Sequence, residues 1–153
     1  MKLVEFLPLE MVLPDLKAER KPALLVELAQ ACAEFSTEVD PERLIRVLRD
    51  RERLGSTGVG DGVALPHGKL PGLSRLLVGF GRSRVGVDFE SQDGQPAHLF
   101  FLLVAPEDSS GQHLRTLARI SRICKTAAFR ERLLDAVGQE ALYSAILEED
   151  GRE

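Results

Sequence analysis

The 153 residues include only three histidines, one tyrosine and no tryptophan, so few side chains are available for acid–base or nucleophilic chemistry. One of these histidines, His67, stands between Pro66 and Gly68. The proline restricts the backbone before the imidazole, and the glycine lets the chain turn directly after it. Because an unperturbed imidazole has a pKa of about 6.5, it is a neutral nucleophile at physiological pH. We interpret His67 as a nucleophile at the end of a strand.

A glycine-rich loop precedes this histidine. Its glycines surround one short apolar piece, Val63–Leu65, and they are Gly55, Gly58, Gly60, Gly62 and Gly68. Such density predicts tight turns whose backbone amides are open to bind an anion. The loop lacks the Gly-Lys-Ser/Thr ending of a nucleotide-binding P-loop. Arg51 lies just before it, in the predicted last turn of a helix.

The elements that must position these residues follow from hydrophobic spacing. Helices are predicted from Pro22 to Phe35 and, with Asp40 as N-cap and Pro41 in the first turn, to about Arg53. Three strands should follow, at residues 75–81, 85–89 and 97–104, the last of them covered on both faces. Three helices are predicted at the end of the chain. The first is capped by Ser109, which has capping-box spacing to Gln112, the second is capped by Thr126, and the last covers residues 142–147. The fold class is α/β, a single sheet flanked by helices.

Composition excludes several classes of protein. The net charge of −4 argues against a nucleic-acid or anionic-membrane binder, which would normally show a basic excess. The longest apolar stretch, Leu99–Ala105, is far too short to span a membrane, and no signal-type segment opens the chain. Cys32 and Cys124 have no metal-type or redox-type spacing, which favours a reducing, cytoplasmic setting. We expect a single domain over residues 1–153.

The segment from Ser56 to Lys69, Ser-Thr-Gly-Val-Gly-Asp-Gly-Val-Ala-Leu-Pro-His-Gly-Lys, resembles the phosphorylation-site signature of type-2 enzyme IIA domains of the phosphotransferase system. These form the fructose/mannitol and nitrogen-related class. The resemblance runs from about residue 5 to 148 and includes Arg51-Glu52, Val87-Asp88-Phe89, Asp93-Gly94-Gln95-Pro96, Leu99–Pro106 and Gln112-His113-Leu114. It implies the mixed β-sheet of that family, flanked by helices.

The resemblance also implies a role for each site residue. His67 would receive a phosphoryl group from a histidine phosphocarrier protein, itself charged by enzyme I from phosphoenolpyruvate. His113 would lie beside it and orient the ring or the phosphoryl group, and Arg51 would hold the phosphoryl oxygens. These roles suit the chemistry, because a phosphoryl group brings roughly −1.5 to −2 charges and arginine offers a planar, permanently charged fork of donors. No cofactor and no metal is implied.

Each candidate also has a structural interpretation. Arg51 belongs to a cluster of arginines in the last turn of a helix, where cations suit the helix dipole. Ser56 and Thr57 can serve only to cap or brace the loop. Lys69 can be an ordinary surface lysine or can attract an acidic or phosphorylated partner. His98 opens the buried strand and is expected to hydrogen-bond locally, and both cysteines lie on apolar helix faces and are read as small core residues.

Several functions remain open at this point. We favour a nitrogen-type regulator whose phosphorylation state alters its binding to target proteins. The alternative is a stand-alone IIA component of a fructose- or mannitol-type sugar permease, which hands the phosphoryl group to a IIB domain. Weaker alternatives are a hydrolase using Ser56 or Thr57 with His67 and Asp61, a metal site of His67, His113 and a carboxylate, and a binding module that has lost phosphorylation.

Overall fold

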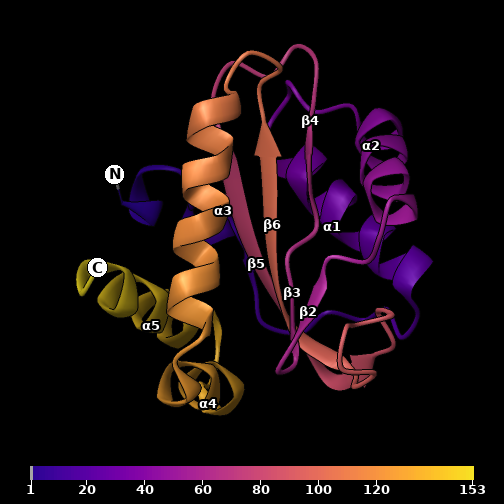
Figure 1. Ribbon diagram of the computed structural model, residues 1–153. Helices are drawn as coiled ribbons and strands as arrows, with labels where there is room; N and C mark the ends of the chain where they lie inside the picture. Colours follow the sequence, from indigo (N-terminus) through magenta and orange to yellow (C-terminus); the bar gives the residue numbers. More distant parts are fainter. Residues whose placement is uncertain (1) are drawn as a thin grey trace.

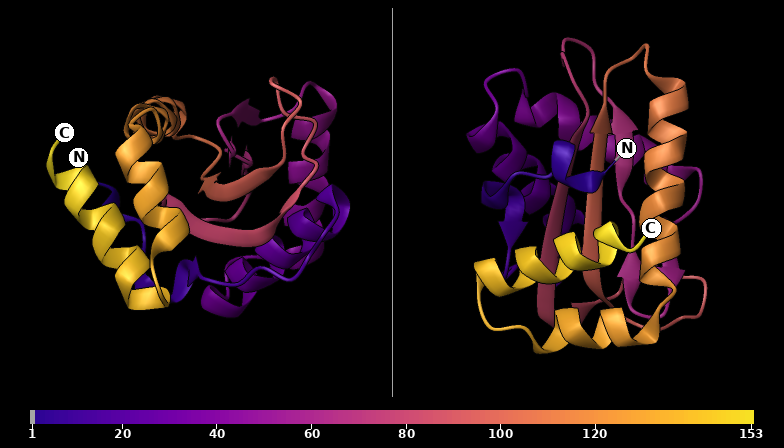
Figure 2. Two further views of the ribbon diagram at one scale, coloured as in Figure 1. Left: turned by 90° about the horizontal axis from the view of Figure 1, so that it is seen from below. Right: turned by 90° about the vertical axis from the view of Figure 1, so that its left-hand side faces the viewer.

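The computed structural model describes residues 2–153 as one mixed β-sheet with helices on both faces (Figure 1). The helices are α1 (Lys21–Phe35), α2 (Pro41–Arg53), α3 (Ser110–Cys124), α4 (Ala127–Asp135) and α5 (Gln139–Gly151), with short 3-10 turns η1 (Leu3–Glu5) and η2 (Leu9–Met11). Helices α1 and α2 cover one face of the sheet, and the three C-terminal helices cover the other (Figure 2). None of the helices within residues 2–153 is long and apolar enough to cross a membrane.

The strands are β1 (Val12–Leu13), β2 (Gly58–Gly60), β3 (Val63–Ala64), β4 (His67–Lys69), β5 (Leu77–Val87) and β6 (Ala97–Ala105). They are arranged in the order β1-β5-β6-β3-β2, and β4 also pairs with β6. Pairs β5–β6 and β2–β3 are antiparallel, whereas β1–β5, β3–β6 and β4–β6 are parallel. The mixed sheet implied by the resemblance is therefore confirmed.

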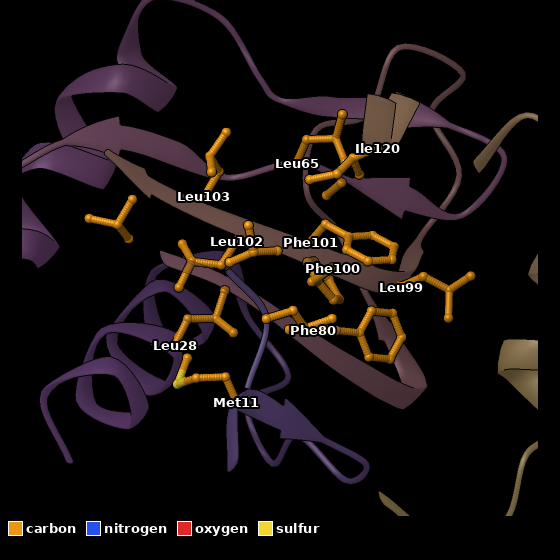
Figure 3. Packing of buried hydrophobic residues seen from close by; sticks show 14 of the residues in the cluster. Met11, Leu28, Leu65, Phe80, Leu99, Phe100, Phe101, Leu102, Leu103 and Ile120 are labelled. Atoms are coloured by element: carbon orange, nitrogen blue, oxygen red, sulfur yellow. The ribbon is translucent and has the colours of Figure 1, made fainter. Parts of the chain in front are cut away.

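Strand β6 forms the centre of the core, as its nearly continuous apolar sequence predicts. Every residue of β6 except His98 is buried. Phe101 packs against Phe80 of the neighbouring strand with ring centroids 4.9 Å apart (Figure 3). Phe100 packs against Phe89 with ring centroids 5.5 Å apart. The strand is thus fixed from both sides and provides a rigid support for the residues that pair with it.

The prediction of separate strands at residues 75–81 and 85–89 is wrong. A single strand, β5, begins at Leu77 and continues to Val87. The pairing of β5 with β6 shifts register between Arg82 and Val87, which is the signature of a bulge. The shift places Val85 in solvent (70% exposed) while Val87 is fully buried, so the apparent alternation did not mark one buried face.

The helix starts are partly as expected. Asp40 caps α2 by accepting a hydrogen bond from the backbone N–H of Glu42, as predicted. Ser109 stands at the N-cap of α3, but its hydroxyl donates to the Pro106 carbonyl instead, so no capping box forms. Thr126 likewise makes no side-chain cap to α4. Those helix starts are therefore fixed by packing against the sheet, not by side-chain caps.

Candidate functional site

The segment that carries His67 runs along β6 in two pieces. Val63 and Ala64 pair with its first half, and His67–Lys69 pair with its second half. Leu65 and Pro66 interrupt this pairing, because proline has no N–H for the ladder. The interruption leaves the Leu65 peptide free to bond elsewhere. Strand β4 packs against α2 (Figure 1), and Gly68 is the residue that faces Val47 of that helix. Because side chains alternate along a strand, His67 lies on the other face, next to His113 of α3, and Arg51 reaches it from the end of α2.

Both ring nitrogens of His67 have partners. Nδ1 lies 2.7 Å from the Leu65 carbonyl oxygen, and Nε2 lies 3.3 Å from Nε of Arg51. A carbonyl oxygen only accepts, so Nδ1 must carry the proton and donate it. Nε2 then has the lone pair and accepts from the guanidinium. The geometry therefore presents Nε2 as the nucleophilic atom of the ring.

Arg51 lies in the last turn of α2, and Nη1 of its guanidinium donates to the Gly55 carbonyl at 2.9 Å. That bond ties the end of the helix to the first glycine of the loop and aims Nε at His67. Among the three arginines near the end of α2, Arg53 instead pairs with exposed Asp50 at 2.8 Å. Helical phase thus separates Arg51, which faces the histidine, from its neighbours on the solvent side.

His113 lies in the first turn of α3, where the sequence predicts it. Its ring stands nearly perpendicular to that of His67 (80°), with centroids 5.3 Å apart. Its Nε2 is buried and, within the described part of the chain, has no hydrogen-bond partner. A buried polar atom without a partner is costly, which is typical of a functional site. The structure therefore brings His67, His113 and Arg51 together.

Both histidines of this cluster are held neutral at physiological pH. The pKa of His67 is lowered mainly by burial; the Leu65 carbonyl opposes this, nearby Arg51 lowers it further and Glu52 raises it. The pKa of His113 is lowered by burial first, then by His67 and Lys69. Neutral rings are what a nucleophile and its neighbouring donor need.

The hydroxyls of Ser56 and Thr57 brace the loop. Ser56 Oγ donates to the Phe89 carbonyl at 2.5 Å, and Thr57 Oγ1 donates to Glu52. With both nitrogens of His67 engaged by Leu65 and Arg51, the hydrolase alternative has no Ser–His or Thr–His pair. Across residues 2–153, no cluster of three or more His, Cys, Asp or Glu side chains is placed to hold a metal ion.

The expectation that the glycine loop offers open amides is wrong for three of its residues. The N–H of Thr57 donates to Glu52, that of Gly58 to Ser56 Oγ, and that of Asp61 to Asp93. The left-handed backbone at Asp61 (φ 57°) and at the flanking glycines makes these tight turns possible. These three amides hold the loop itself, so they do not serve as donors to an anion at His67.

A pocket of about 340 Å³ opens beside His67. The glycine loop, α3 and the segment between β5 and β6 line this pocket together with Arg51 and His67. Their lining residues are Ser56, Thr57, Val59, Leu65, Gln92, Leu117, Ala118 and Ser121. Lys69, two residues after the histidine, donates to Ser110 Oγ at the start of α3 with a 2.6 Å contact. Lys69 thus contributes positive charge next to His113. The sequence left two interpretations of this lysine open, an ordinary surface residue or one that attracts an acidic or phosphorylated partner.

Two charged residues of the site were missed from the sequence. Glu52 is nearly buried, with a side chain 5% exposed, and pairs with Lys21 Nζ at 3.0 Å. Its position between two arginines in a polar helix end resembles a solvated face, so no local signal marks it as buried.

His98, in contrast, behaves as predicted, since its Nδ1 bonds the Ser83 carbonyl at 2.9 Å.

The two cysteines are also where the sequence places them. Cys32 and Cys124 are free and buried, and burial raises the pKa of each thiol to about 12. A thiol with such a pKa is not a nucleophile at neutral pH. The chemistry of the molecule is therefore concentrated at the histidine pair.

Comparison with known proteins agrees with this fold and cluster. The family model described as "Phosphoenolpyruvate-dependent sugar phosphotransferase system, EIIA 2" matches residues 5–149. A fold of this topology with a histidine pair beside its central strand is the EIIA type 2 domain, a phosphocarrier of the phosphotransferase system. The chain belongs to that family.

Its relatives include both regulators and sugar-system components. The chain is 41% identical over 146 residues to a nitrogen regulatory protein of Bradyrhizobium diazoefficiens, covering 95% of each chain. It is 33% identical to the fructose-specific EIIABC component of Bacillus subtilis, covering 98% of this chain but 24% of that longer protein. The crystal structure of the nitrogen regulatory protein IIA-Ntr of Neisseria meningitidis superimposes with a TM-score of 0.87 at 32% identity, covering 93% of this chain and 97% of that one.

Proposed function

We propose that His67 is the phosphoryl acceptor of this EIIA domain and that Nε2 is the atom phosphorylated by a histidine phosphocarrier protein. The observation that supports this most directly is the bond from Nδ1 to the Leu65 carbonyl, 2.7 Å long. It commits the Nδ1 proton and leaves Nε2 as the only ring nitrogen with a lone pair. That nitrogen faces Arg51 and the pocket.

In the transfer, Nε2 of His67 attacks the phosphorus of the carrier's phosphohistidine, and a new N–P bond forms. The N–P bond of the carrier breaks, and the carrier nitrogen keeps the electron pair. As Nε2 gives up its lone pair, positive charge develops on the ring, and the Nδ1–H bond to the Leu65 carbonyl stabilises that charge. The enzyme class is therefore a phosphohistidine-forming transferase component, with catalysis by positioning and charge stabilisation.

The phosphoryl oxygens would be held by side chains. When Nε2 becomes bonded to phosphorus it can no longer accept from Arg51, so the guanidinium is released to bind the oxygens as a charged fork. Nε2 of His113, buried without a partner, can donate to a phosphoryl oxygen if that nitrogen carries the ring proton. Lys69 adds positive charge close by. We assign no metal and no cofactor to this step.

Incubation with phosphoenolpyruvate, enzyme I and a histidine phosphocarrier protein tests the assignment. The intact mass should increase by one acid-labile phosphoryl group. His67→Ala should abolish the gain, and His113→Ala should slow transfer or shorten the lifetime of the product. His98→Gln is the matched control, because the side chain of His98 bonds to the Ser83 carbonyl and not to a residue of the site. Phosphorylation of Ser56, or no uptake from any carrier, refutes the proposal.

Beyond the transfer itself, we propose that the protein is a nitrogen-type regulator in the cytoplasm, whose phosphorylation state alters its binding to target proteins. Support comes from the 41% identity to a nitrogen regulatory protein over nearly the whole of both chains. The alternative, a IIA component that passes the phosphoryl group to the IIB domain of a sugar permease, draws on the 33% identity to part of a fructose-specific EIIABC component.

Affinity capture separates the two versions. The unmodified protein and His67→Asp, which places a carboxylate where the phosphoryl group would be, should retain different sets of proteins if the function is regulatory. Phosphoryl transfer from the labelled protein to an isolated IIB domain, with that domain as the sole dominant partner, refutes the regulatory version. His98→Asp controls for the added charge, because it places the carboxylate away from the site.

A further inference from the structure

A continuous chain of hydrogen bonds runs from the first residue of α1 to the imidazole of His67. Lys21 Nζ lies 3.0 Å from Glu52 Oε1, and Glu52 accepts from both the N–H and the hydroxyl of Thr57. The carbonyl of Thr57 accepts from Leu65 N at 3.0 Å. The carbonyl of Leu65 then accepts from Nδ1 of His67 at 2.7 Å. Each residue in this chain is therefore fixed by the one before it.

The chain starts from a buried ion pair. The side chains of Lys21 and Glu52 are only 12% and 5% exposed. Lys21 is further confined by the Phe89 ring, 4.6 Å from Nζ, and by Glu90 Oε1 at 3.1 Å. Buried charges are tolerated only in good geometry with their remaining hydrogen bonds satisfied. Glu52 meets this condition through Lys21 and Thr57, so its carboxylate has little freedom to move.

The Leu65 peptide depends on this anchor because the sheet does not hold it. Strand β3 ends at Ala64, and Pro66 has no N–H to donate. The Leu65 N–H therefore bonds to Thr57, and its carbonyl is free to face His67. The orientation of the carbonyl that accepts the Nδ1 proton is set by the loop, and the loop is set by Glu52.

We propose that Glu52, held by Lys21, is a positioning residue that selects the reactive tautomer of His67 through Thr57 and the Leu65 peptide. Two adjacent residues of α2 then control opposite edges of the same ring. Arg51 contacts Nε2 directly, whereas Glu52 acts on Nδ1 through three intervening hydrogen bonds. The orienting partner of a reactive histidine determines which nitrogen is free. The consequence for phosphoryl transfer rests on the proposed function, but the tautomer itself does not.

The test measures the tautomer directly, by NMR of isotope-labelled imidazole nitrogens in the unphosphorylated full chain. In the unsubstituted protein His67 should be protonated at Nδ1. Glu52→Gln should lower the ratio of that tautomer to the other by about fivefold, the factor expected from weakening one hydrogen-bond link. Thr57→Val should shift it in the same direction, and Thr57→Ser, which keeps the hydroxyl, should restore it.

Two controls separate positioning from general effects. Glu90→Gln removes an equal charge from the same lysine, but Glu90 is exposed and has no bond to Thr57, so the His67 tautomer should not change. His98 is the internal reference in every spectrum, because its Nδ1 bonds to the Ser83 carbonyl outside this chain of bonds. Three results overturn the proposal. They are an unchanged tautomer ratio of His67 in Glu52→Gln, an equal change of that ratio in Glu90→Gln, and a parallel change of the tautomer ratio of His98.

The phosphoryl assay distinguishes this inference from the proposed function. Glu52→Gln and Thr57→Val should slow uptake from the phosphocarrier by a factor close to their change in tautomer ratio, whereas Thr57→Ser and Glu90→Gln should not. If the unsubstituted protein takes up no phosphoryl group but the tautomer shifts as described, the proposed function fails and the positioning role stands. If Glu52→Gln does not fold, the Thr57 pair of variants decides the question alone.

Discussion

Gly68→Ala should displace α2 from the reactive histidine, and a second substitution should reverse the effect. A Cβ placed on Gly68 would come within 3.0 Å of Val47 Cγ1, closer than real Cβ atoms approach a neighbour. Because carbon atoms pack at about 3.5–4.0 Å, helix and strand must separate by roughly an ångström or more. Val47 is β-branched and cannot swing its methyl group away freely. Overpacking of this kind costs about 1–3 kcal/mol of unfolding free energy.

The displacement matters because Arg51 lies one helical turn after Val47. Its Nε is already 3.3 Å from Nε2 of His67, near the limit of a hydrogen bond. A shift of this size breaks that contact, and a misplacement near 1 Å at a reactive group can cost about a hundredfold in rate. We therefore expect Gly68→Ala to lose stability and to slow phosphoryl uptake by about 10- to 100-fold.

The double variant Gly68→Ala/Val47→Ala is the decisive measurement. The new Cβ would lie 3.8 Å from Val47 Cβ and 3.9 Å from its carbonyl oxygen, which are ordinary contacts, so only Cγ1 needs to be removed. We would measure urea unfolding and the rate of phosphoryl uptake for the unsubstituted protein, both single variants and the double variant. Together these measurements form a double-mutant cycle. We expect a favourable coupling of about 1–2 kcal/mol and recovery of the rate. Additive effects, or an unaffected single variant, would refute the reasoning.

Three further predictions follow from other contacts. Because the pKa values of His67 and His113 are lowered in the folded state, the unfolded chain binds protons first as the pH falls. The free energy of unfolding should therefore decrease below about pH 6.5 and level off below the folded pKa values. Replacing both rings by glutamine should make the free energy of unfolding, measured by denaturation at several pH values, depend less on pH in this range. Arg82→Met should lower stability by about 2–3 kcal/mol in urea, because this buried guanidinium donates to carbonyls at the end of α4 that would lose their partner. Asp150→Asn should cost about 3–5 kcal/mol, since it removes the buried carboxylate that balances the charge of Arg119, whereas Asp50→Asn at an exposed pair should cost less than about 1 kcal/mol in the same assay.

Local sequence was sufficient for the features that depend on local chemistry. Pro66 and Gly68 mark His67 as a special position because their backbone preferences act on immediate neighbours. Helical phase and the Asp40-Pro41 start place α2 correctly, and with it Arg51. The resemblance to the enzyme IIA signature added His113, which position alone would have left as a partly exposed helix residue.

Features set by contacts distant in sequence were not predictable in this way. Glu52 is a buried charge only because Lys21 and Thr57 reach it from other elements. The exposed position of Val85 follows from a register shift against β6, which the alternation of residue types does not reveal. The amide of Asp61, which was expected to be open, is occupied because the segment after β5 folds back onto the glycine loop, as its bond to Asp93 shows. Apart from the two predicted strands that form the single strand β5, these errors concern partners and not elements.

The distribution of charge explains why the two histidines must stay neutral. A phosphoryl group adds roughly two negative charges, and the amides of Thr57 and Gly58 that could help to balance them already bond within the loop. A protonated His67 could not attack, so the compensating charge cannot come from that ring. It must come from groups that remain cationic at any physiological pH, and Arg51 and Lys69 occupy those positions. Phosphorylation at Nε2 would then exchange a neutral hydrogen-bond acceptor for an anion at the mouth of the pocket without requiring the sheet to move, and a partner would distinguish the two states by charge.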